Sequence, residues 1–338
     1  MPELAAPPGG QGEPAGSTTR RPPLDPELAA ALDEMQKAGR VTVTPGNIPM
    51  LRARSAEITP TWADLLAGLD MEHTTGHATA PDGAPVTLDV LAPSAGGAAA
   101  AAICYLHGGG MVLGSARTGI EVPLSWAAEH RAVLVSVEYR LAPEFPYPTP
   151  VEDCYAALTW VREHADEIGI DPSRILLAGQ SAGGGLAAAV TLMARDRGGP
   201  HVTGQLLMGP MLDDRNETRS SHELIDEGVW DRASNITGWD ALLGARRGAP
   251  DVSPYAAPSR AADLSDLPPA YIDVGSCEIF RDEDVDYAVR LWHAGGQVEL
   301  HVWPGGFHAF DVLAPQARLS VISAATRTAW VSRLLAAR

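Results

Sequence analysis

A serine in the pattern G-x-S-x-G, placed directly after an apolar run, constrains the fold of this chain more than any other feature. The run 175–178 has the length of a buried strand, and an Ala-rich segment of helical composition covers 186–195. Between them, Gly179-Gln180-Ser181-Ala182-Gly183 predicts a sharp strand-to-helix turn, which needs very small residues such as Gly179 and Gly183 on either side of the serine. Such a turn exposes Ser181 Oγ at the carboxyl edge of a sheet, beside a helix N-terminus. A tightly packed turn with a purely structural role is the alternative.

The rest of the chain alternates between short apolar runs and segments of helical periodicity. Strands are expected at 73–79, 86–92, 99–106, 133–138, 175–178, 205–208, 270–274 and 298–303. Helices are expected at 26–38 with Asp25 as N-cap, 61–69, 119–130, 151–168, 182–195, 282–294 and 320–337. This alternation from residue 99 onward predicts an α/β fold with a mostly parallel sheet covered on both faces.

Composition divides the chain into a core and less regular segments. Residues 1–24 are rich in Pro, Gly, Ser and Thr and are expected to be disordered. Residues 25–70 carry no catalytic pattern and resemble a lid or wrapping segment. The polar, irregular stretch 212–266 interrupts the alternating pattern and is interpreted as an insertion, so that 71–211 and 267–338 form the core.

Charge and composition exclude several classes of partner. The net charge of −17 disfavours binding to phosphate backbones, so no nucleic-acid partner is expected. There is no run of 18 apolar residues and the N-terminus lacks the features of a secretory signal, which predicts a cytoplasmic protein without a membrane span. Three cysteines argue against a disulfide framework.

A glycine run after the predicted strand 99–106 supplies candidate donors for a developing oxyanion. In His107-Gly108-Gly109-Gly110, backbone N–H groups are exposed without an obstructing Cβ, and those of Gly109 and Gly110 would join that of Ala182. A nucleotide-binding loop is the alternative. It fails because Leu113 occupies the last glycine position of G-x-G-x-x-G counted from Gly108, and no Gly-Lys-Ser/Thr follows.

A base and an acid follow Ser181 in the order that serine acyl transfer on an α/β sheet requires. His308 lies in a loop just past the last predicted strand, whereas the other histidines fall on other elements or break the order. Glu278 lies early in the loop after strand 270–274 and is the preferred acid, with Asp282 as the alternative. There is no H-E-x-x-H and no clustered Cys/His spacing, so neither a metal nor another cofactor is expected.

Several linked motifs resemble the hormone-sensitive-lipase-like family of α/β-hydrolases, bacterial carboxylesterases among them. The resemblance covers roughly 71–337 and rests on HGGGMVLGS (107–115), YRLAPEFPYPTPVED (139–153), GQSAGG (179–184) and PGGFHAF (304–310), with MLDDR (211–215) and SPYAAP (253–258). It implies an eight-stranded α/β-hydrolase core with a helical cap formed by 1–70 and 212–266. It also implies Ser181 as nucleophile, His308 as base, and Gly109, Gly110 and Ala182 as oxyanion donors. The family's usual acid is Asp, so Glu278 departs from the pattern.

The resemblance implies a serine esterase for short-chain acyl esters, and members of the family often form homodimers. A tailoring hydrolase is a second interpretation, in which a lactone is opened or closed or acetate is removed or eliminated on a larger metabolite. Trp230 and Trp239 in the insertion could shape its pocket or form the core of the cap. A peptidase or amidase would use the same residues. A ligand receptor that binds without reacting is the non-enzymatic interpretation. Receptors with this fold characteristically lack part of the catalytic triad.

Overall fold

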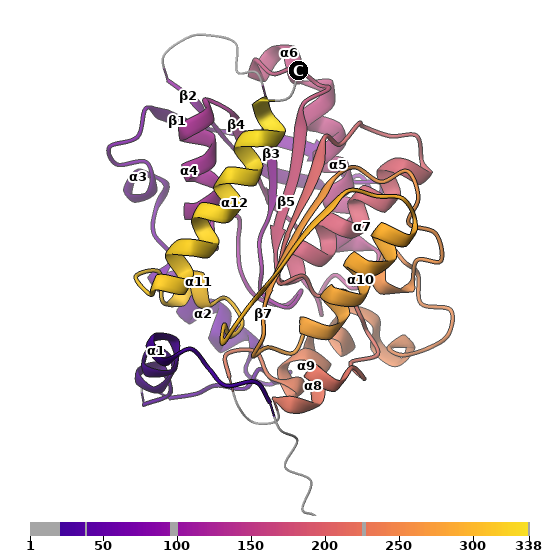
Figure 1. The fold of residues 1–338 in the computed structure, drawn as a ribbon. Coiled ribbons are helices and arrows are strands. Elements are labelled where there is room, and N and C mark those ends of the chain that lie inside the picture. The colour runs from indigo at the N-terminus through magenta and orange to yellow at the C-terminus, as the bar shows by residue number, and fades with distance from the viewer. Residues whose placement is uncertain (1–20, 38, 95–100, 225–227, 337–338) are drawn as a thin grey trace, which may run out of the picture.

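The computed structural model describes residues 21–37, 39–94, 101–224 and 228–336. Most of the segment expected to be disordered, 1–24, therefore lies outside the described residues, as do Ala38 and the first residues of the strand expected at 99–106. The described chain is built on one eight-stranded sheet (Figure 1).

The strand order, β1-β2-β4-β3-β5-β6-β7-β8, has an antiparallel edge and a parallel centre. β1 pairs with β2 and β2 with β4 in antiparallel fashion, while every later pair is parallel. The strands are β1 (Met71–Thr79), β2 (Pro85–Pro93), β3 (Ala102–Leu106), β4 (Val133–Glu138), β5 (Ile175–Gln180), β6 (Gly204–Met208), β7 (Ala270–Gly275) and β8 (Val298–Trp303). The predicted mostly parallel, eight-stranded sheet is confirmed.

Helices cover both faces of the sheet, as the sequence predicts. Their bounds are α1 (Pro26–Lys37), α2 (Ile48–Ile58), α3 (Trp62–Leu65), α4 (Glu121–His130), α5 (Thr149–Glu163), α6 (Ala165–Ile168), α7 (Ala182–Asp196), α8 (Arg219–Glu223), α9 (Arg232–Leu243), α10 (Arg281–His293), α11 (Phe310–Leu313) and α12 (Arg318–Ala336). One face packs against α4 and α12, and the other against α5, α7 and α10. β3 and β5, at the centre, are buried throughout, as expected for strands covered on both sides.

Several predicted helices differ from those of the structure. The helix expected at 151–168 begins at Thr149 and breaks at His164 into α5 and α6, and the one expected at 61–69 is the single turn α3. Asp25 caps α1 as predicted, because its Oδ1 accepts from the N–H groups of Glu27 and Leu28. α2 was not expected because only Ile48 of its residues is buried, so it has no apolar face to detect.

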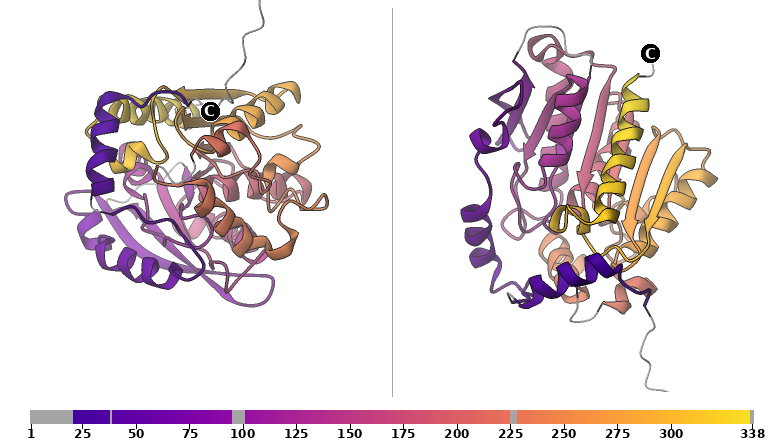
Figure 2. Two further views of the ribbon diagram at one scale, coloured as in Figure 1. Left: turned by 90° about the horizontal axis from the view of Figure 1, so that it is seen from below. Right: turned by 60° about the vertical axis from the view of Figure 1, so that its left-hand side comes forward.

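The segments outside the core meet at one end of the sheet. α1, α2, α8 and α9 gather there (Figures 1 and 2). The two segments are joined by hydrogen bonds, since the Val43 N–H donates to Ser234 Oγ (2.9 Å) and Thr237 Oγ1 donates to the Val43 carbonyl (3.0 Å). Residues far apart in sequence therefore lie together above the carboxyl ends of the parallel strands.

Candidate active site

Ser181 occupies the strained turn between β5 and α7. Its φ of 57° and ψ of −120° lie in a region that L residues rarely adopt. A Cβ on Gly179 would overlap the carbonyl of Gly183, and a Cβ on Gly183 would overlap that of Leu106. The turn therefore requires both glycines of the motif and holds Ser181 at the end of the central strand.

Ser181, His308 and Glu278 form a continuous chain of hydrogen bonds. Ser181 Oγ lies 2.9 Å from His308 Nε2, and His308 Nδ1 lies 3.1 Å from Glu278 Oε2. All three residues are buried, with exposed fractions of 6%, 7% and 3%. These distances are within the range for nucleophile–base and base–acid hydrogen bonds in acyl transfer.

The other candidate acid, Asp282, lies in a different environment. Its carboxylate accepts from the Ser220 N–H (2.8 Å) and from Arg281 Nε (2.8 Å). Burial acts to raise the pKa of Asp282, but these hydrogen bonds lower it below its ordinary value. In the described part of the chain it makes no hydrogen bond to His308, so the structure brings Glu278 and not Asp282 to the imidazole.

Gly209 leaves space for the longer acidic side chain. It follows β6 with φ 50°, and a Cβ there would lie 3.2 Å from Glu278 Oε1 and 3.7 Å from His308 Cε1. Any side chain at this position would therefore crowd the carboxylate. The glycine therefore leaves room for the glutamate side chain to face the imidazole.

The loop after β3 packs closely against Ser181. Gly109 (φ 128°) and Gly110 (φ 61°) have conformations that favour glycine. A Cβ on Gly108 would lie 3.3 Å from Ser181 Cβ, which shows how closely the loop approaches the serine. The N–H groups of Gly109, Gly110 and Ala182 take no part in the backbone hydrogen bonds recorded for the described residues.

His107 supports this loop from the core. It is fully buried and stacks on Tyr139 with 4.2 Å between ring centroids. Tyr139 donates a hydrogen bond to the His107 carbonyl (2.8 Å), and His107 Nδ1 lies 2.8 Å from the Gly108 carbonyl. Burial lowers the pKa of His107 to about 4, so the ring is neutral at pH 7 and suited to a structural role.

A buried ion network joins the segments that carry the base and the acid. Arg327 of α12 donates from Nε to Asp273 Oδ2 (2.7 Å) and also pairs with Asp311. Trp303 Nε1 donates to the same Asp273 oxygen (2.9 Å). Asp273 lies on β7, which precedes Glu278, while Trp303 and Asp311 flank the loop of His308. The network therefore fixes the two loops relative to each other.

Two further buried carboxyl groups lie behind Glu278. Burial raises the pKa of both Glu283 and Asp284 well above their ordinary values. The Leu212 and Asp213 N–H groups donate to Glu283 Oε1 (2.7 and 3.1 Å), which acts in the opposite direction. Neither oxygen of Asp284 has a hydrogen-bond partner among the described residues. Asp284 is therefore the carboxyl group whose ionisation the fold opposes most clearly.

Replacing Asp284 with Asn is expected to flatten the dependence of stability on pH. Because the pKa of Asp284 is raised in the folded state, the folded protein retains a proton that the unfolded chain releases above the ordinary value of 3.8. Stability is then lost as the pH rises from this value toward the folded pKa, by about 1.4 kcal/mol per pH unit for one such group. Urea unfolding at pH 5, 6, 7 and 8 measures the slope.

Asp282→Asn is the matched control on the same helix. The pKa of Asp282 is lowered, so its contribution to stability is fully present above pH 5 and is lost only in more acidic solution. This control should lower stability equally at all four pH values and leave the slope unchanged. Parallel curves for wild type and Asp284→Asn would contradict the prediction.

A cavity of about 360 Å³ opens onto Ser181 and His308. Its remaining described lining residues are Val41, Val43, Leu51, Gly108, Gly109, Gly110, Leu113, Thr118, Gly119, Gln180, Val229, Trp230, Ala309, Val312 and Leu313. Most of the large apolar side chains come from the N-terminal segment, the insertion and α11, with Leu113 from the loop after β3. No sequence pattern marked Val41, Val43 or Leu51, because their place in the cavity depends on contacts with distant segments.

The two tryptophans of the insertion have different surroundings. Trp239 is fully buried, as expected for the core of a cap. Trp230 lines the cavity and covers Gly110 so closely that a Cβ on this glycine would overlap the indole. Its Nε1 donates to Asn235 Oδ1 (3.1 Å), which fixes the ring.

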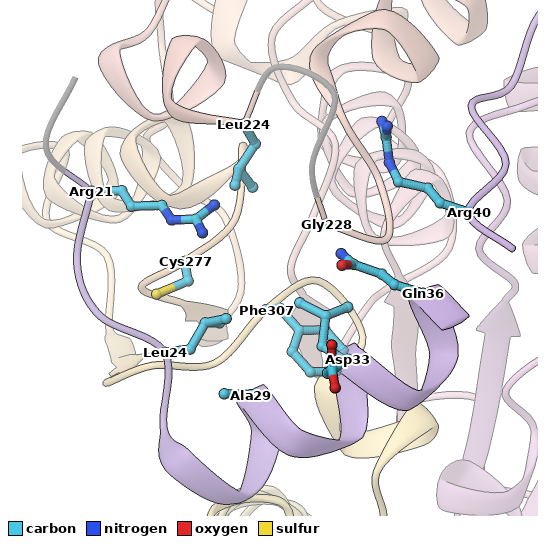
Figure 3. A pocket seen from close by; sticks show the side chains of 11 residues that line it. Arg21, Leu24, Ala29, Asp33, Gln36, Arg40, Leu224, Gly228, Cys277 and Phe307 are labelled. Atoms are coloured by element: carbon cyan, nitrogen blue, oxygen red, sulfur yellow. The ribbon is translucent and has the colours of Figure 1, made fainter. Parts of the chain in front are cut away.

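A second cavity, of about 520 Å³, lies between α1 and the loops that contain Cys277 and Phe307 (Figure 3). Asp33 and Gln36 of α1 face Cys277 and Leu224 across it. It shares no described lining residue with the cavity at Ser181. None of Ser181, His308 and Glu278 is among its described lining residues, although Cys277 and Phe307 immediately precede Glu278 and His308 in the sequence.

The described residues show no membrane-spanning helix and no metal cluster. None of the helices within 21–37, 39–94, 101–224 and 228–336 is long and apolar enough to cross a membrane. The same residues contain no group of three or more His, Cys, Asp or Glu side chains arranged to hold a metal ion.

Comparisons with known proteins agree with this geometry. A family model described as the alpha/beta hydrolase fold matches residues 103–312. Carboxylesterase NlhH of Mycobacterium tuberculosis (strain ATCC 25618 / H37Rv) is 37% identical over 301 residues, which cover 87% of this chain and 90% of the relative. The solved structure of a bacterial heroin esterase is 41% identical, with a TM-score of 0.85 over 92% of this chain and 98% of that one. Esterase LipW from Mycobacterium marinum is 33% identical, with a TM-score of 0.81 over 93% and 98%.

The family model covers more than half of the chain, and the similarity to NlhH extends over most of both sequences. The resemblance predicted from the glycine and serine motifs is therefore confirmed. The chain belongs to the α/β-hydrolase family, in its hormone-sensitive-lipase-like carboxylesterase branch.

Proposed function

We propose that this chain is a serine carboxylesterase that hydrolyses short-chain acyl esters through an acyl-enzyme intermediate. One observation carries the proposal: the hydrogen-bonded chain from Ser181 Oγ through His308 to Glu278 opens onto an apolar cavity. Relatives named carboxylesterase and esterase support the same reaction class.

Ser181 attacks the ester carbonyl while His308 Nε2 accepts its proton. Glu278 accepts the Nδ1–H of the imidazole and stabilises the imidazolium that forms. The tetrahedral intermediate then collapses, His308 protonates the leaving alcohol, and Ser181 remains acylated. Water, deprotonated by His308, hydrolyses this intermediate and regenerates the serine.

Gly109, Gly110 and Ala182 are the proposed oxyanion donors. Their N–H groups lie in the loop against Ser181 and at the first residue of α7, and the positive end of the helix dipole adds to their effect. One such donor is typically worth about 10²- to 10³-fold in rate. His107, Gly108, Gly179 and Gly183 keep the two loops in position.

Residues 25–70 and 212–266 are the proposed cap over the core of 71–211 and 267–338. Both segments contribute walls to the cavity, with Val41, Val43 and Leu51 from the first and Val229 and Trp230 from the second. The hydrogen bonds at Val43 connect them. A cap of this kind encloses the substrate and limits the length of the acyl chain.

The chain-length profile of ester hydrolysis tests the proposed substrate class. With a cavity of about 360 Å³, kcat/KM for 4-nitrophenyl esters is expected to peak at acyl chains of about eight carbons or fewer and to fall for longer ones. A spectrophotometric series from acetate to laurate measures the profile. A maximum at ten carbons or more would contradict the proposed substrate class.

A specialised tailoring reaction, such as lactone opening or closing, deacetylation or acetate elimination, is the second candidate. The indole of Trp230 in the cavity wall favours it, because a fixed aromatic surface suits a larger metabolite. Negligible turnover of simple acetyl and butyryl esters by a protein that still acylates Ser181 would support this candidate. A receptor that does not react would show no acylation.

The cytoplasmic location and the homodimer stay predictions.

A further inference from the structure

The cavity at Ser181 contains one amide side chain, which the proposed reaction does not use. No Asp, Glu, Lys or Arg is among its described lining residues. Ser181 and His308 belong to the hydrogen-bonded chain, and Thr118 Oγ1 already accepts from the Ser115 N–H (3.0 Å). The primary amide of Gln180 remains.

Gln180 is the last residue of β5 and immediately precedes Ser181. Its side chain is directed toward Gly119, where a Cβ would lie 2.8 Å from Gln180 Oε1. Gly119 has φ 67°, a conformation that favours glycine, so the backbone here leaves space for the amide. The residue is 9% exposed and lines the cavity together with Thr118 and Gly119.

The Gln180 amide makes no hydrogen bond to the described part of the chain, although it can donate two and accept two. Gln205, on the neighbouring strand β6, offers a comparison. Both of its amide atoms also lack a partner, but it is fully buried and does not line the cavity. Of these two glutamines, only Gln180 can meet a bound molecule.

We propose that Gln180 hydrogen-bonds a polar group of the substrate close to the ester carbonyl, and that it is a specificity-determining residue. The substrate class is then an uncharged ester that is mostly apolar and carries an ether, hydroxyl or carbonyl oxygen a few bonds from the scissile bond. This inference rests on the proposed esterase function. An ester whose acyl and alcohol groups are purely hydrocarbon would displace water from the Gln180 amide without replacing its hydrogen bond. The lost hydrogen bond lowers kcat/KM for such an ester relative to one that carries the additional oxygen.

Two pairs of esters that differ only by a methylene-to-oxygen exchange test the proposal. On the acyl side the pair is 4-nitrophenyl butyrate and 4-nitrophenyl methoxyacetate; on the alcohol side it is butyl acetate and 2-methoxyethyl acetate. The measured quantity is the preference, the kcat/KM of the ether ester divided by that of the hydrocarbon ester. Gln180→Met, which keeps length without the amide, is expected to lower this preference about 10- to 100-fold in at least one pair.

Gln205→Leu is the matched control and should keep the wild-type preference. Should Gln180→Met not fold, the wild-type enzyme alone tests the proposal. Its preference is then compared with the ratio of the rate constants for hydroxide-catalysed hydrolysis of the same two esters, which measures their intrinsic reactivity. A wild-type preference about 10-fold or more above that reference supports the proposal. An unchanged preference in Gln180→Met, or a wild-type preference at the reference in both pairs, would overturn it. Turnover without preference refutes only the role of Gln180, whereas no turnover of any ester refutes the esterase function.

Discussion

Replacing Ser181 with Ala should lower kcat for 4-nitrophenyl acetate by about 10⁴- to 10⁶-fold. The substitution removes the only hydroxyl within hydrogen-bond distance of His308 among the described residues, with Oγ and Nε2 separated by 2.9 Å. No acyl-enzyme can form without it. The initial burst of 4-nitrophenol, measured by stopped flow, should also disappear.

Thermal unfolding provides the control for Ser181→Ala. Ser181 is at the turn with φ 57°, and alanine tolerates this conformation no better than serine, so the variant should unfold close to the wild-type temperature. A variant that folds and keeps a large fraction of wild-type kcat would show that another residue is the nucleophile.

Replacing Glu278 with Gln should lower kcat by about 10⁴-fold. The carboxylate lies 3.1 Å from His308 Nδ1 and accepts the proton that fixes the tautomer of the imidazole. An amide keeps the size of the side chain but loses the charge that stabilises the imidazolium. KM should change little, because Glu278 does not line the cavity at Ser181.

Asp282→Asn is the matched variant for this prediction. The Asp282 carboxylate accepts hydrogen bonds from Ser220 and Arg281 and, in the described part of the chain, makes none with His308. Its replacement by Asn should therefore leave kcat close to the wild-type value. Steady-state kinetics on both purified variants measures the contrast. A large loss of kcat in Asp282→Asn together with near-normal kcat in Glu278→Gln would transfer the role of the acid to Asp282.

Features that depend on local chemistry could be predicted from the sequence. The turn at Ser181 was predictable because its two glycines are required by contacts within a few residues of the serine and by the adjacent strand. His308 could be selected by its order after Ser181 and its place just beyond the last strand. The alternation of strands and helices was sufficient to predict the parallel sheet with two covered faces.

Features that depend on distant segments could not be predicted. α2 has only Ile48 buried, and Arg52 helps hold it to the core by donating to the carbonyls of Val112 (2.7 Å) and Ala142 (2.7 Å). The preference for Glu278 over Asp282 rests on its place early in the loop, whereas its contact with His308 and the space beside Gly209 are seen only in the structure. The position of Val43 in the cavity wall depends on Ser234 and Thr237, almost two hundred residues away.

Covalent labelling with a fluorophosphonate, followed by peptide mass spectrometry, tests the central claim most directly. The claim is that His308 activates Ser181 as a nucleophile beside an oxyanion site. We expect one phosphonyl group per chain, located on Ser181, and no labelling of the Ser181→Ala variant. A folded wild-type protein that stays unlabelled, or that carries the label on another residue, would contradict it.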